Sequence, residues 1–497
     1  MGLKKNVLYS GFLTSSLYVF QFITYPYVSR VLGVSGVGIC NFAQTIVHYF
    51  ILLSTLGITS IGVREIAKCK EDKFKLNKTF SGIFQVNAIL TSLVLVVYVI
   101  LIEILPQLLP YRRLLYIGVV QIIFNTLSID WLFKGLENFR YITIRTFWVK
   151  ILYVISVFAF VRDKDDYDLY YVIIVGSVII NGIINWGYGR RLVKYAWQPL
   201  YEICRLYVRP LFLLGSQIIF QVLYTDFIVI YLGFISNDAQ VGLYTTATKI
   251  LSIVLALYSS FTLVMMPRIS SLCAERNYEQ IKLLTNKSFA LLYSFALPCV
   301  FLLIIFARET IGIISGPGYE GAIQLLKIAA PIILIAGVEQ ILILQLILPL
   351  HMDKAFFYNS IAGATVGLVL IFTLVPSLLS LGAIIAWGTS ECAVLLAAYY
   401  FVRKKIGKVL DLKMTCIYFI SYLPLLAIFI ISTFLFSDRY TAFVFSLFTM
   451  GIYSHVNLLF ILRNEIYIKI LEQMKDKFKQ NFFIVFPAAL LTIVIFY

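Results

Sequence analysis

Apolar residues in this chain are grouped in runs of helical length, separated by short polar segments. A helix needs about 20 apolar residues to cross roughly 30 Å of hydrocarbon. Fourteen runs are of this kind, at residues 7–28, 37–63, 80–105, 113–134, 141–161, 169–189, 210–235, 241–266, 288–306, 321–347, 355–376, 381–402, 414–436 and 440–462. The pattern predicts an all-α polytopic membrane protein with about 14 transmembrane helices.

The first apolar run and the last residues of the chain need separate arguments on whether they span the membrane. The first run ends in Tyr25-Pro26-Tyr27 instead of a small-residue cleavage site, so we expect a retained first span and no signal peptide. Residues 482–497 are apolar but short, contain Pro487 and follow the charged segment 463–480. We expect an interfacial or partly inserted tail there, with a fifteenth span as the alternative.

Composition supports a membrane protein and excludes several other classes. Of the 497 residues, 61% are hydrophobic and 13% are charged, which leaves too few polar side chains to cover a soluble surface. The seven cysteines are scattered singly, without a metal-ligand spacing. No cofactor or metal is therefore expected, and the absence of a G-x-x-x-x-G-K-[ST] segment argues against ATP hydrolysis.

Basic residues are distributed unevenly between alternate loops. If the N-terminus is inside, the inner segments hold 30 of the 41 Lys and Arg residues, and the outer segments hold seven: Arg30, Arg112, Arg113, Arg162, Lys164, Arg308 and Arg439. Cytoplasmic loops carry such an excess, so both termini are predicted to be cytoplasmic. The topology accounts for most of the net charge of +16, and no nucleic-acid partner is expected.

The two halves of the chain share a spacing. Gly11 and Gly215, Gly38 and Gly242, and Ala43 and Ala247 are all 204 residues apart. Six spans per half make the halves parallel repeats. We expect an N-terminal six-helix lobe with a cytoplasmic linker (1–209), a C-terminal six-helix lobe (210–402), two extra helices, 13 and 14 (403–462), and a cytoplasmic or interfacial C-terminal tail (463–497).

Two motifs resemble a known family. The first, between the first two spans, is Pro26-x-x-Ser29-Arg30-x-Leu32-Gly33-x-x-Gly36-x-Gly38. The second, after the fourth span, is Asp130-Trp131-Leu132-Phe133-Lys134-Gly135-Leu136-Glu137. Together with the two-half layout they resemble the Wzx-type polysaccharide flippases, which handle O-antigen or capsule repeat units within the multidrug, oligosaccharidyl-lipid and polysaccharide exporter superfamily.

The resemblance implies a function and a location. Such proteins translocate undecaprenyl-diphosphate-linked oligosaccharide repeat units across the bacterial inner membrane. Alternating access of the two lobes would carry the glycan, coupled to an H⁺ or Na⁺ gradient. The implied partners are this lipid-linked glycan, membrane lipids, and a polysaccharide polymerase with its chain-length regulator.

Charged residues inside the predicted spans are the candidate functional groups, because each costs roughly 2.5 to 3.5 kcal/mol at the bilayer centre unless it faces a cavity or a partner. A cationic substrate-binding cavity would involve Arg145, Lys150, Lys249 and Lys327 within the spans, together with Arg30 at the outer end of the first span. Ion coupling or ion pairing would involve Asp130, Asp226, Glu339 and Glu391.

Each candidate also has a structural alternative. Arg145 and Lys327 lie near span ends and could extend to lipid phosphates, and Asp226 could pair with Lys249 at matching depth. Glu339 and Glu391 could be packed and hydrogen-bonded against neighbouring helices. Arg145 and Lys150 are about 140° apart around a helix, so they cannot both point straight into one cavity.

Three other functions stay open. A lipid II flippase of the same superfamily also has fourteen spans. A drug or cation antiporter would need an acidic residue in the first span, which has none. A membrane glycosyltransferase or polymerase usually needs a large external loop, and the longest outer connection, residues 307–320, is short. We therefore expect a transporter and no enzyme.

Overall fold

The computed structural model describes residues 3–462, and the regular elements in this range are all helical. The predicted all-α fold is therefore confirmed. In the same range eleven helices are long and apolar enough to cross a membrane, or up to twelve if one bent pair is a single span. The expected count of fourteen is not confirmed, and the expected tail at 463–497 lies outside the described residues.

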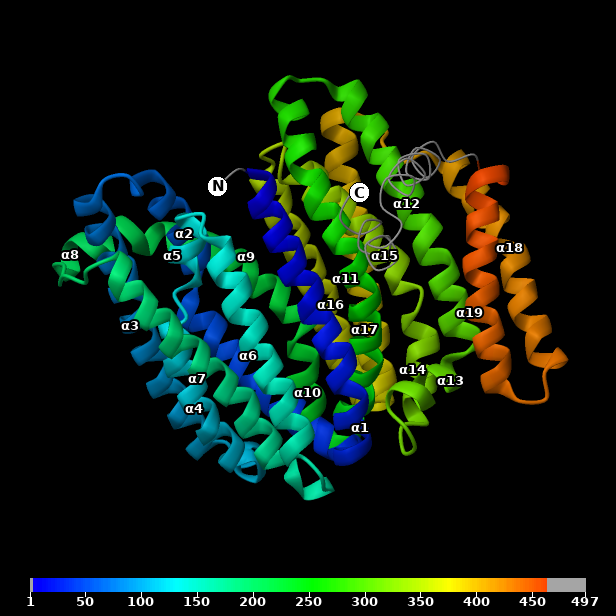
Figure 1. Ribbon diagram of the computed structural model, residues 1–497, viewed down its shortest axis with the longest axis horizontal. Helices are drawn as coiled ribbons and strands as arrows, with labels where there is room; N and C mark the ends of the chain where they lie inside the picture. The colour runs from blue at the N-terminus through cyan, green and yellow to red at the C-terminus, as the bar shows by residue number, and fades with distance from the viewer. Residues whose placement is uncertain (1–2, 463–497) are drawn as a thin grey trace, which may run out of the picture. The chain divides into compact units, whose positions relative to one another are not determined.

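Among the described residues, the first compact unit, unit 1, comprises 3–245 and 367–383. In Figure 1 its helices α3, α4, α7 and α6 lie side by side, and α1 packs against α6 and α4. The helices that lie within unit 1 are α1 (Leu3–Thr55), α2 (Ile58–Cys69), α3 (Lys73–Ile104), η1 (Pro106–Tyr111), α4 (Arg112–Leu127), α5 (Asp130–Gly135), α6 (Phe139–Phe160), η2 (Lys164–Asp166), α7 (Tyr167–Leu192), α8 (Leu200–Ile203), η3 (Cys204–Val208), α9 (Arg209–Thr225) and α10 (Phe227–Ile235).

Among the described residues, the second compact unit, unit 2, comprises 246–366 and 384–462. Its helices α12, α18 and α19 pack together (Figure 1). Three helices have parts in both units: α11 (Asp238–Ala274), α16 (Asp353–Leu378) and α17 (Ser380–Ile406). The others in unit 2 are α12 (Tyr278–Ile305), α13 (Ala307–Ile314), α14 (Gly321–Ala329), α15 (Ile332–Gln340), η4 (Ile341–Ile347), α18 (Leu412–Leu435), α19 (Arg439–Val456) and η5 (Asn457–Ile461). The lobe boundaries at residues 209 and 402 stay a prediction.

The corner expected between the first two spans lies inside α1, which consists of two helices joined across a kink at Gly33. α1 runs through Pro26, and its backbone departs from helical geometry at Gly33, with φ 68° and ψ 178°. A side chain at this left-handed φ would be strained, so glycine permits the bend. The next interruption is at Gly57, with φ 79°, which separates α1 from α2. Two expected spans, 7–28 and 37–63, therefore fall largely within α1.

Two other expected spans are also broken. The run 210–235 is divided at Asp226 into α9 and α10, each too short to span alone. The run 321–347 is divided near Pro331 into α14 and the helical segment 332–347, with a bend of 41°. Proline cannot donate the helical hydrogen bond at that point, which favours the break. These interruptions explain why hydrophobic run length alone gave a higher count.

Positions 204 residues apart meet in unit 1. A Cβ on Gly38 would lie 1.8 Å from the carbonyl oxygen of Asp238, and one on Gly242 would lie 2.1 Å from that of Val34. Three residues further along each helix, Asn41 Nδ2 donates to Thr245 Oγ1 at 3.0 Å. Corresponding residues of two repeats contact each other where the repeats face one another, as in a two-fold interface. The spacing seen in the sequence therefore corresponds to direct contact between α1 and the first turns of α11.

The linker after α7 lies along α3 as an extended segment. Its backbone N–H groups at Lys194, Ala196 and Gln198 donate to side chains of Asn77, Ser81 and Gln85, at 2.8, 2.9 and 3.1 Å. Two residues of extended chain and four residues of helix both advance by about 6 to 7 Å, so the two series stay in register. The linker is thus attached to the end of unit 1 that the charge distribution predicts to be cytoplasmic.

Candidate functional site

The motif at residues 130–137 forms a packed cluster at one end of unit 1. Trp131 is buried, stacks on Phe80 at 5.6 Å and fills the space beside Gly62. Phe133 packs on the ring of Tyr141 at 4.8 Å, and Gly135 lies against Ile66. The last motif residue, Glu137, accepts from Lys70 Nζ at 2.9 Å. Packing between α2, α5 and α6 therefore accounts for most residues of this motif.

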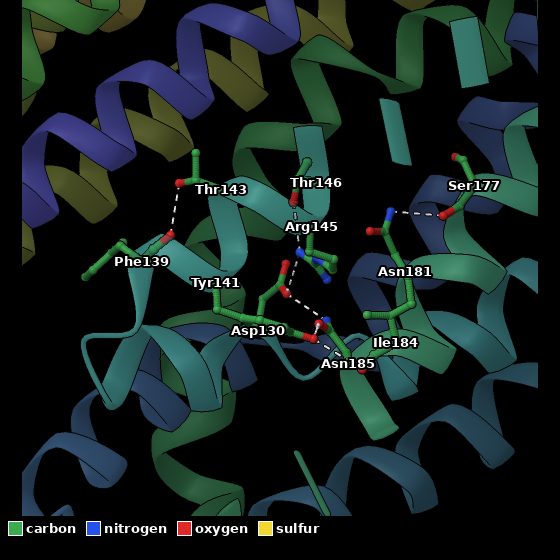
Figure 2. A network of polar contacts seen from close by, with 10 residues as sticks. All are labelled: Asp130, Phe139, Tyr141, Thr143, Arg145, Thr146, Ser177, Asn181, Ile184 and Asn185. Carbon is green, nitrogen blue, oxygen red and sulfur yellow. Dashed lines mark hydrogen bonds and ion pairs between the residues drawn. The ribbon is translucent and has the colours of Figure 1, made fainter. Parts of the chain in front are cut away.

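Figure 2 shows Arg145 of α6 within a polar network that begins at the same motif. Its Nη2 lies 3.1 Å from Asp130 Oδ1, and the same oxygen accepts from Asn185 Nδ2 at 2.8 Å. The Arg145 side chain is 5% exposed, and its Nε and Nη1 have no hydrogen-bond partner in the part of the chain that the structure describes. Arg145 is thus a buried, paired cation with donor capacity left over.

Lys150 lies one and a half turns further along α6 in different surroundings. Its Nζ is 4.9 Å from the centre of the Tyr153 ring, and the Tyr153 hydroxyl donates to that of Tyr170 at 3.3 Å. Within residues 3–462 the structure gives Lys150 no carboxylate partner. An aromatic face attracts an ammonium group but does not neutralise it. Of Arg145 and Lys150, Lys150 is therefore the one whose charge an anionic ligand could neutralise.

Arg30 and Asp226 lie elsewhere in unit 1. Arg30 is an exposed residue of α1, three positions before the bend at Gly33. Asp226, at the break between α9 and α10, lies 3.1 Å from His48 Nδ1, and the two side chains are 33% and 48% exposed. The pairing of Asp226 with Lys249 stays untested, because Lys249, partly buried on α11, belongs to unit 2.

Glu339 of α15 and Glu391 of α17 meet in unit 2. The two carboxyl groups are close enough to interact with each other, and Glu391 Oε1 accepts from Trp387 Nε1 at 2.9 Å. Next to Glu339, Gln340 Oε1 accepts from Ser259 Oγ at 2.9 Å. A hydrogen bond between two carboxyl groups requires one proton. The arrangement can therefore hold a proton between two helices.

The backbone around this carboxyl pair is irregular. η4 begins two residues after Glu339 and has π-helical geometry, which often marks functional positions. Gln345 in η4 is fully buried, and its amide atoms have no hydrogen-bond partner within the described residues. A buried amide without hydrogen-bond partners lowers the stability of the fold. Packing alone therefore does not explain why a glutamine occupies position 345.

The structure thus groups some predicted residues and separates others. Arg145 joins Asp130, and Glu339 joins Glu391, whereas Lys327 lies exposed on α14 among other basic residues. Sequence reasoning missed His48 as the partner of Asp226, and Glu309, which is 1% exposed beside Arg439. It also missed Trp387, although its position four residues before Glu391 on one helix face could have indicated the contact.

Fold and site together define a polytopic helical membrane protein with charged groups inside its spans. Residues 3–273 match the model of the family described as "Polysaccharide biosynthesis protein". The chain therefore belongs to this family, which confirms the identification made from the two sequence motifs.

Two relatives carry more specific names. A protein of Escherichia coli (strain K12) named "Putative O-antigen transporter" is 26% identical over 407 residues, which cover 81% of this chain and 97% of that protein. One with the same name from Shigella dysenteriae is 25% identical over 382 residues, covering 75% and 93%.

Two solved structures have the same fold. The inward closed conformation of the lipid II flippase MurJ matches with a TM-score of 0.74 and 13% identity, covering 93% of this chain and 100% of the other. An inward-facing multidrug resistance transporter of the MATE family, within the MOP superfamily, matches with a TM-score of 0.60 and 13% identity, covering 82% and 95%. At these identities the likeness shows the fold alone.

Proposed function

We propose that this protein is a flippase that moves undecaprenyl-diphosphate-linked oligosaccharide repeat units across the bacterial inner membrane by alternating access. Its family and the names of its two relatives support a transporter of lipid-linked polysaccharide precursors over an enzyme. The observation that carries the substrate class is Lys150, an ammonium group inside a membrane helix without a carboxylate partner in the described residues. A diphosphate would neutralise this charge during passage.

The composition of α6 supports the same class of substrate. Its three charged residues are all basic, at positions 140, 145 and 150, and it has no acidic residue. Arg145 is already paired with Asp130, and Arg140 is exposed at the beginning of the helix. Lys150, with Arg30 near the predicted outer end of the first span, is therefore our principal candidate for contact with the substrate.

The test is complementation in the bacterium that encodes the chain. Deletion of the gene should stop surface polysaccharide and leave lipid-linked repeat units at the cytoplasmic leaflet. Lys150→Ala and Arg30→Ala should restore less than about a tenth of export while the protein still accumulates in the membrane. Arg140→Ala, on the same helix as Lys150, is the matched control and should export normally.

Two outcomes would contradict the proposal. Wild-type export with Lys150→Ala and Arg30→Ala would remove these residues from the mechanism. A chain that sustains growth of cells depleted of their lipid II flippase, but leaves surface polysaccharide unchanged on deletion, would be a lipid II flippase instead.

We also propose that the Glu339 and Glu391 pair couples transport to the proton gradient. A shared proton suits H⁺ better than Na⁺, which needs several oxygen ligands at once. Glu339→Gln and Glu391→Gln should each abolish the stimulation of export by an imposed pH gradient and leave the protein folded. Gln280→Glu, an exposed change at the beginning of α12, adds a carboxyl away from the pair and should leave the dependence of export on the pH gradient intact. A sodium-dependent, pH-independent wild type would exclude proton coupling.

A further inference from the structure

Three basic side chains from separate parts of unit 2 line one cavity. The cavity has a volume of about 670 Å³, and its polar lining consists of Arg308, Glu320, Gln324, Lys327 and Arg439. A neighbouring cavity of about 470 Å³ shares Arg308 and Glu320 and extends to Gly316 and Tyr440. Ligand sites commonly have volumes of this size, and a diphosphate or a phosphoglycerol group would fit.

The convergence of these cations is unexpected from the charge distribution. The outer segments hold only seven basic residues, of which Arg308 and Arg439 are the two in unit 2. These two are 131 positions apart in the sequence, yet both line this cavity with Lys327. Like charges repel one another, and the carboxylates of Glu309 and Glu320 offset only two of the three cations.

A buried carboxylate, that of Glu309, pairs with Arg439 and fixes its position. Its Nε lies 2.7 Å from Glu309 Oε1, and its Nη2 donates to the Ile305 carbonyl at 3.4 Å. Glu309 is 1% exposed, whereas the Arg439 side chain is 50% exposed. Burial of a carboxylate for one half-exposed partner stabilises the fold little, because desolvation offsets the attraction. The pair does fix the position of the Arg439 guanidinium, which belongs to the lining of the cavity.

The acidic residue in the lining is engaged by its own loop. Glu320 Oε1 accepts from the Gly318 backbone N–H at 3.2 Å. Backbone N–H groups hold the pKa of the Glu320 carboxyl below its ordinary value, and Arg308 lowers it further. With Glu309 set against Arg439 and Glu320 against Arg308, Lys327 supplies one net positive charge. Lys327 has no ion pair within the described residues.

We propose that this cavity binds a phosphate-bearing anion at the end of unit 2 that the charge distribution places at the periplasmic side. Two guanidinium groups and an ammonium group at the mouth of one cavity are the donors that phosphate oxygens prefer. The anion could come from the headgroup of an anionic phospholipid or from the diphosphate of a polyprenyl carrier. The site does not depend on the proposed function, because either source is available to any protein of this membrane.

The experiment uses the full-length protein in phosphatidylcholine nanodiscs with two probes. In these discs, binding of inorganic pyrophosphate is measured by calorimetry. In a second set of discs, made of phosphatidylcholine and phosphatidylglycerol, retention of phosphatidylglycerol by the protein is measured by native mass spectrometry. The double variant Arg308→Gln/Lys327→Gln should weaken binding of the recognised probe about tenfold or more. The matched control Arg162→Gln/Lys164→Gln removes one Arg and one Lys that are exposed in a predicted outer loop of unit 1, and should bind as the wild type does.

Each result decides the proposal. Saturable pyrophosphate binding lost in the cavity variant supports a site for a free or carrier-linked diphosphate. Retention of phosphatidylglycerol alone, lost in the same variant, supports a phospholipid headgroup site. The proposal would be overturned if neither probe bound the wild type, or if both double variants weakened binding of the probe equally. Arg439 is left intact in these variants because its removal would leave Glu309 buried without a partner.

Discussion

The guanidinium of Arg145 is almost completely buried, a position that would cost several kcal/mol for an unpaired cation. Asp130 supplies the opposite charge, and Asn185 holds the Asp130 oxygen that Arg145 also approaches. These side chains come from α5, α6 and α7, so the network joins three helices at one end of unit 1 (Figure 2). A structural role for Arg145 follows directly from these contacts.

Loss of this pair should destabilise the protein. Arg145→Gln leaves Asp130 without its cation, and we expect a loss of about 3 kcal/mol or less, since Asp130 is 36% exposed and partly screened. Thermal unfolding in detergent, followed by size-exclusion chromatography, measures the change. Arg140→Gln, an exposed cation on the same helix, should unfold as the wild type does.

A double-mutant cycle separates pairing from packing. Because each single change removes the same interaction, Asp130→Asn/Arg145→Gln should lose less stability than the two single variants added together. Additive losses would show that Asp130 and Arg145 do not interact in the folded protein.

Individual charged residues could be selected from the sequence, but their partners could not. Run length identified Glu339 and Glu391 as charges inside spans, 52 positions apart, without indicating that they meet. Such pairing depends on the rotation of each helix about its axis, and Gly388 on α17 allows a close approach to Ile332 on α15. Hydrophobic periodicity carries little rotational information in membrane helices, since lipid and protein neighbours are both apolar.

At the level of helices, hydrophobic runs predicted where apolar segments lie better than where helices end. Gly33 and Gly57 interrupt apolar sequence with positive φ angles, and Asp226 divides a run that reads as one span. Pro26, in contrast, stays inside α1. A proline breaks a helix only where no neighbouring element compensates for the missing hydrogen bond. Local composition therefore located candidate breaks but did not decide among them.

The contact between α1 and the first turns of α11 depends on two glycines. A Cβ at Gly38 would overlap the backbone of Asp238, which cannot be relieved by moving a side chain. Small residues allow membrane helices to pack at backbone distance, where dispersion and hydrogen bonds such as Asn41 to Thr245 become available. The recurrence of glycine at a spacing of 204 residues is thus explained by a mutual steric requirement.

Gly38→Ala should therefore reduce the amount of folded protein and lower its unfolding temperature, because the two helices must separate. Gly176→Ala is the control, since a Cβ there would meet nothing within 4 Å and alanine favours the helix. Expression and fluorescence-detected size-exclusion chromatography would measure both. Equal behaviour of the two variants would show that the close approach at Gly38 is not needed.

For the whole molecule, the helical fold and the family could be predicted from the sequence. Its orientation in the membrane, in contrast, rests on the distribution of Lys and Arg between the loops alone. The inner excess of Lys and Arg applies to loops in both units, and the cavity of Arg308, Lys327 and Arg439 lies at an end where such residues are scarce. Orientation therefore decides whether that cavity faces the periplasm. It also decides whether the linker at residues 194–198 faces the cytoplasm.

Cysteine labelling would determine this orientation. In a variant lacking the seven native cysteines, Arg162→Cys and Arg308→Cys should react with a membrane-impermeant maleimide in intact spheroplasts. Lys75→Cys and Lys404→Cys should react only after permeabilisation, because the segments that hold them, 64–78 and 403–413, carry the excess of Lys and Arg that is typical of cytoplasmic loops. All four positions are exposed, so access to reagent and not burial decides the result. Reversed labelling at all four would place both termini outside and turn the Arg308 cavity toward the cytoplasm.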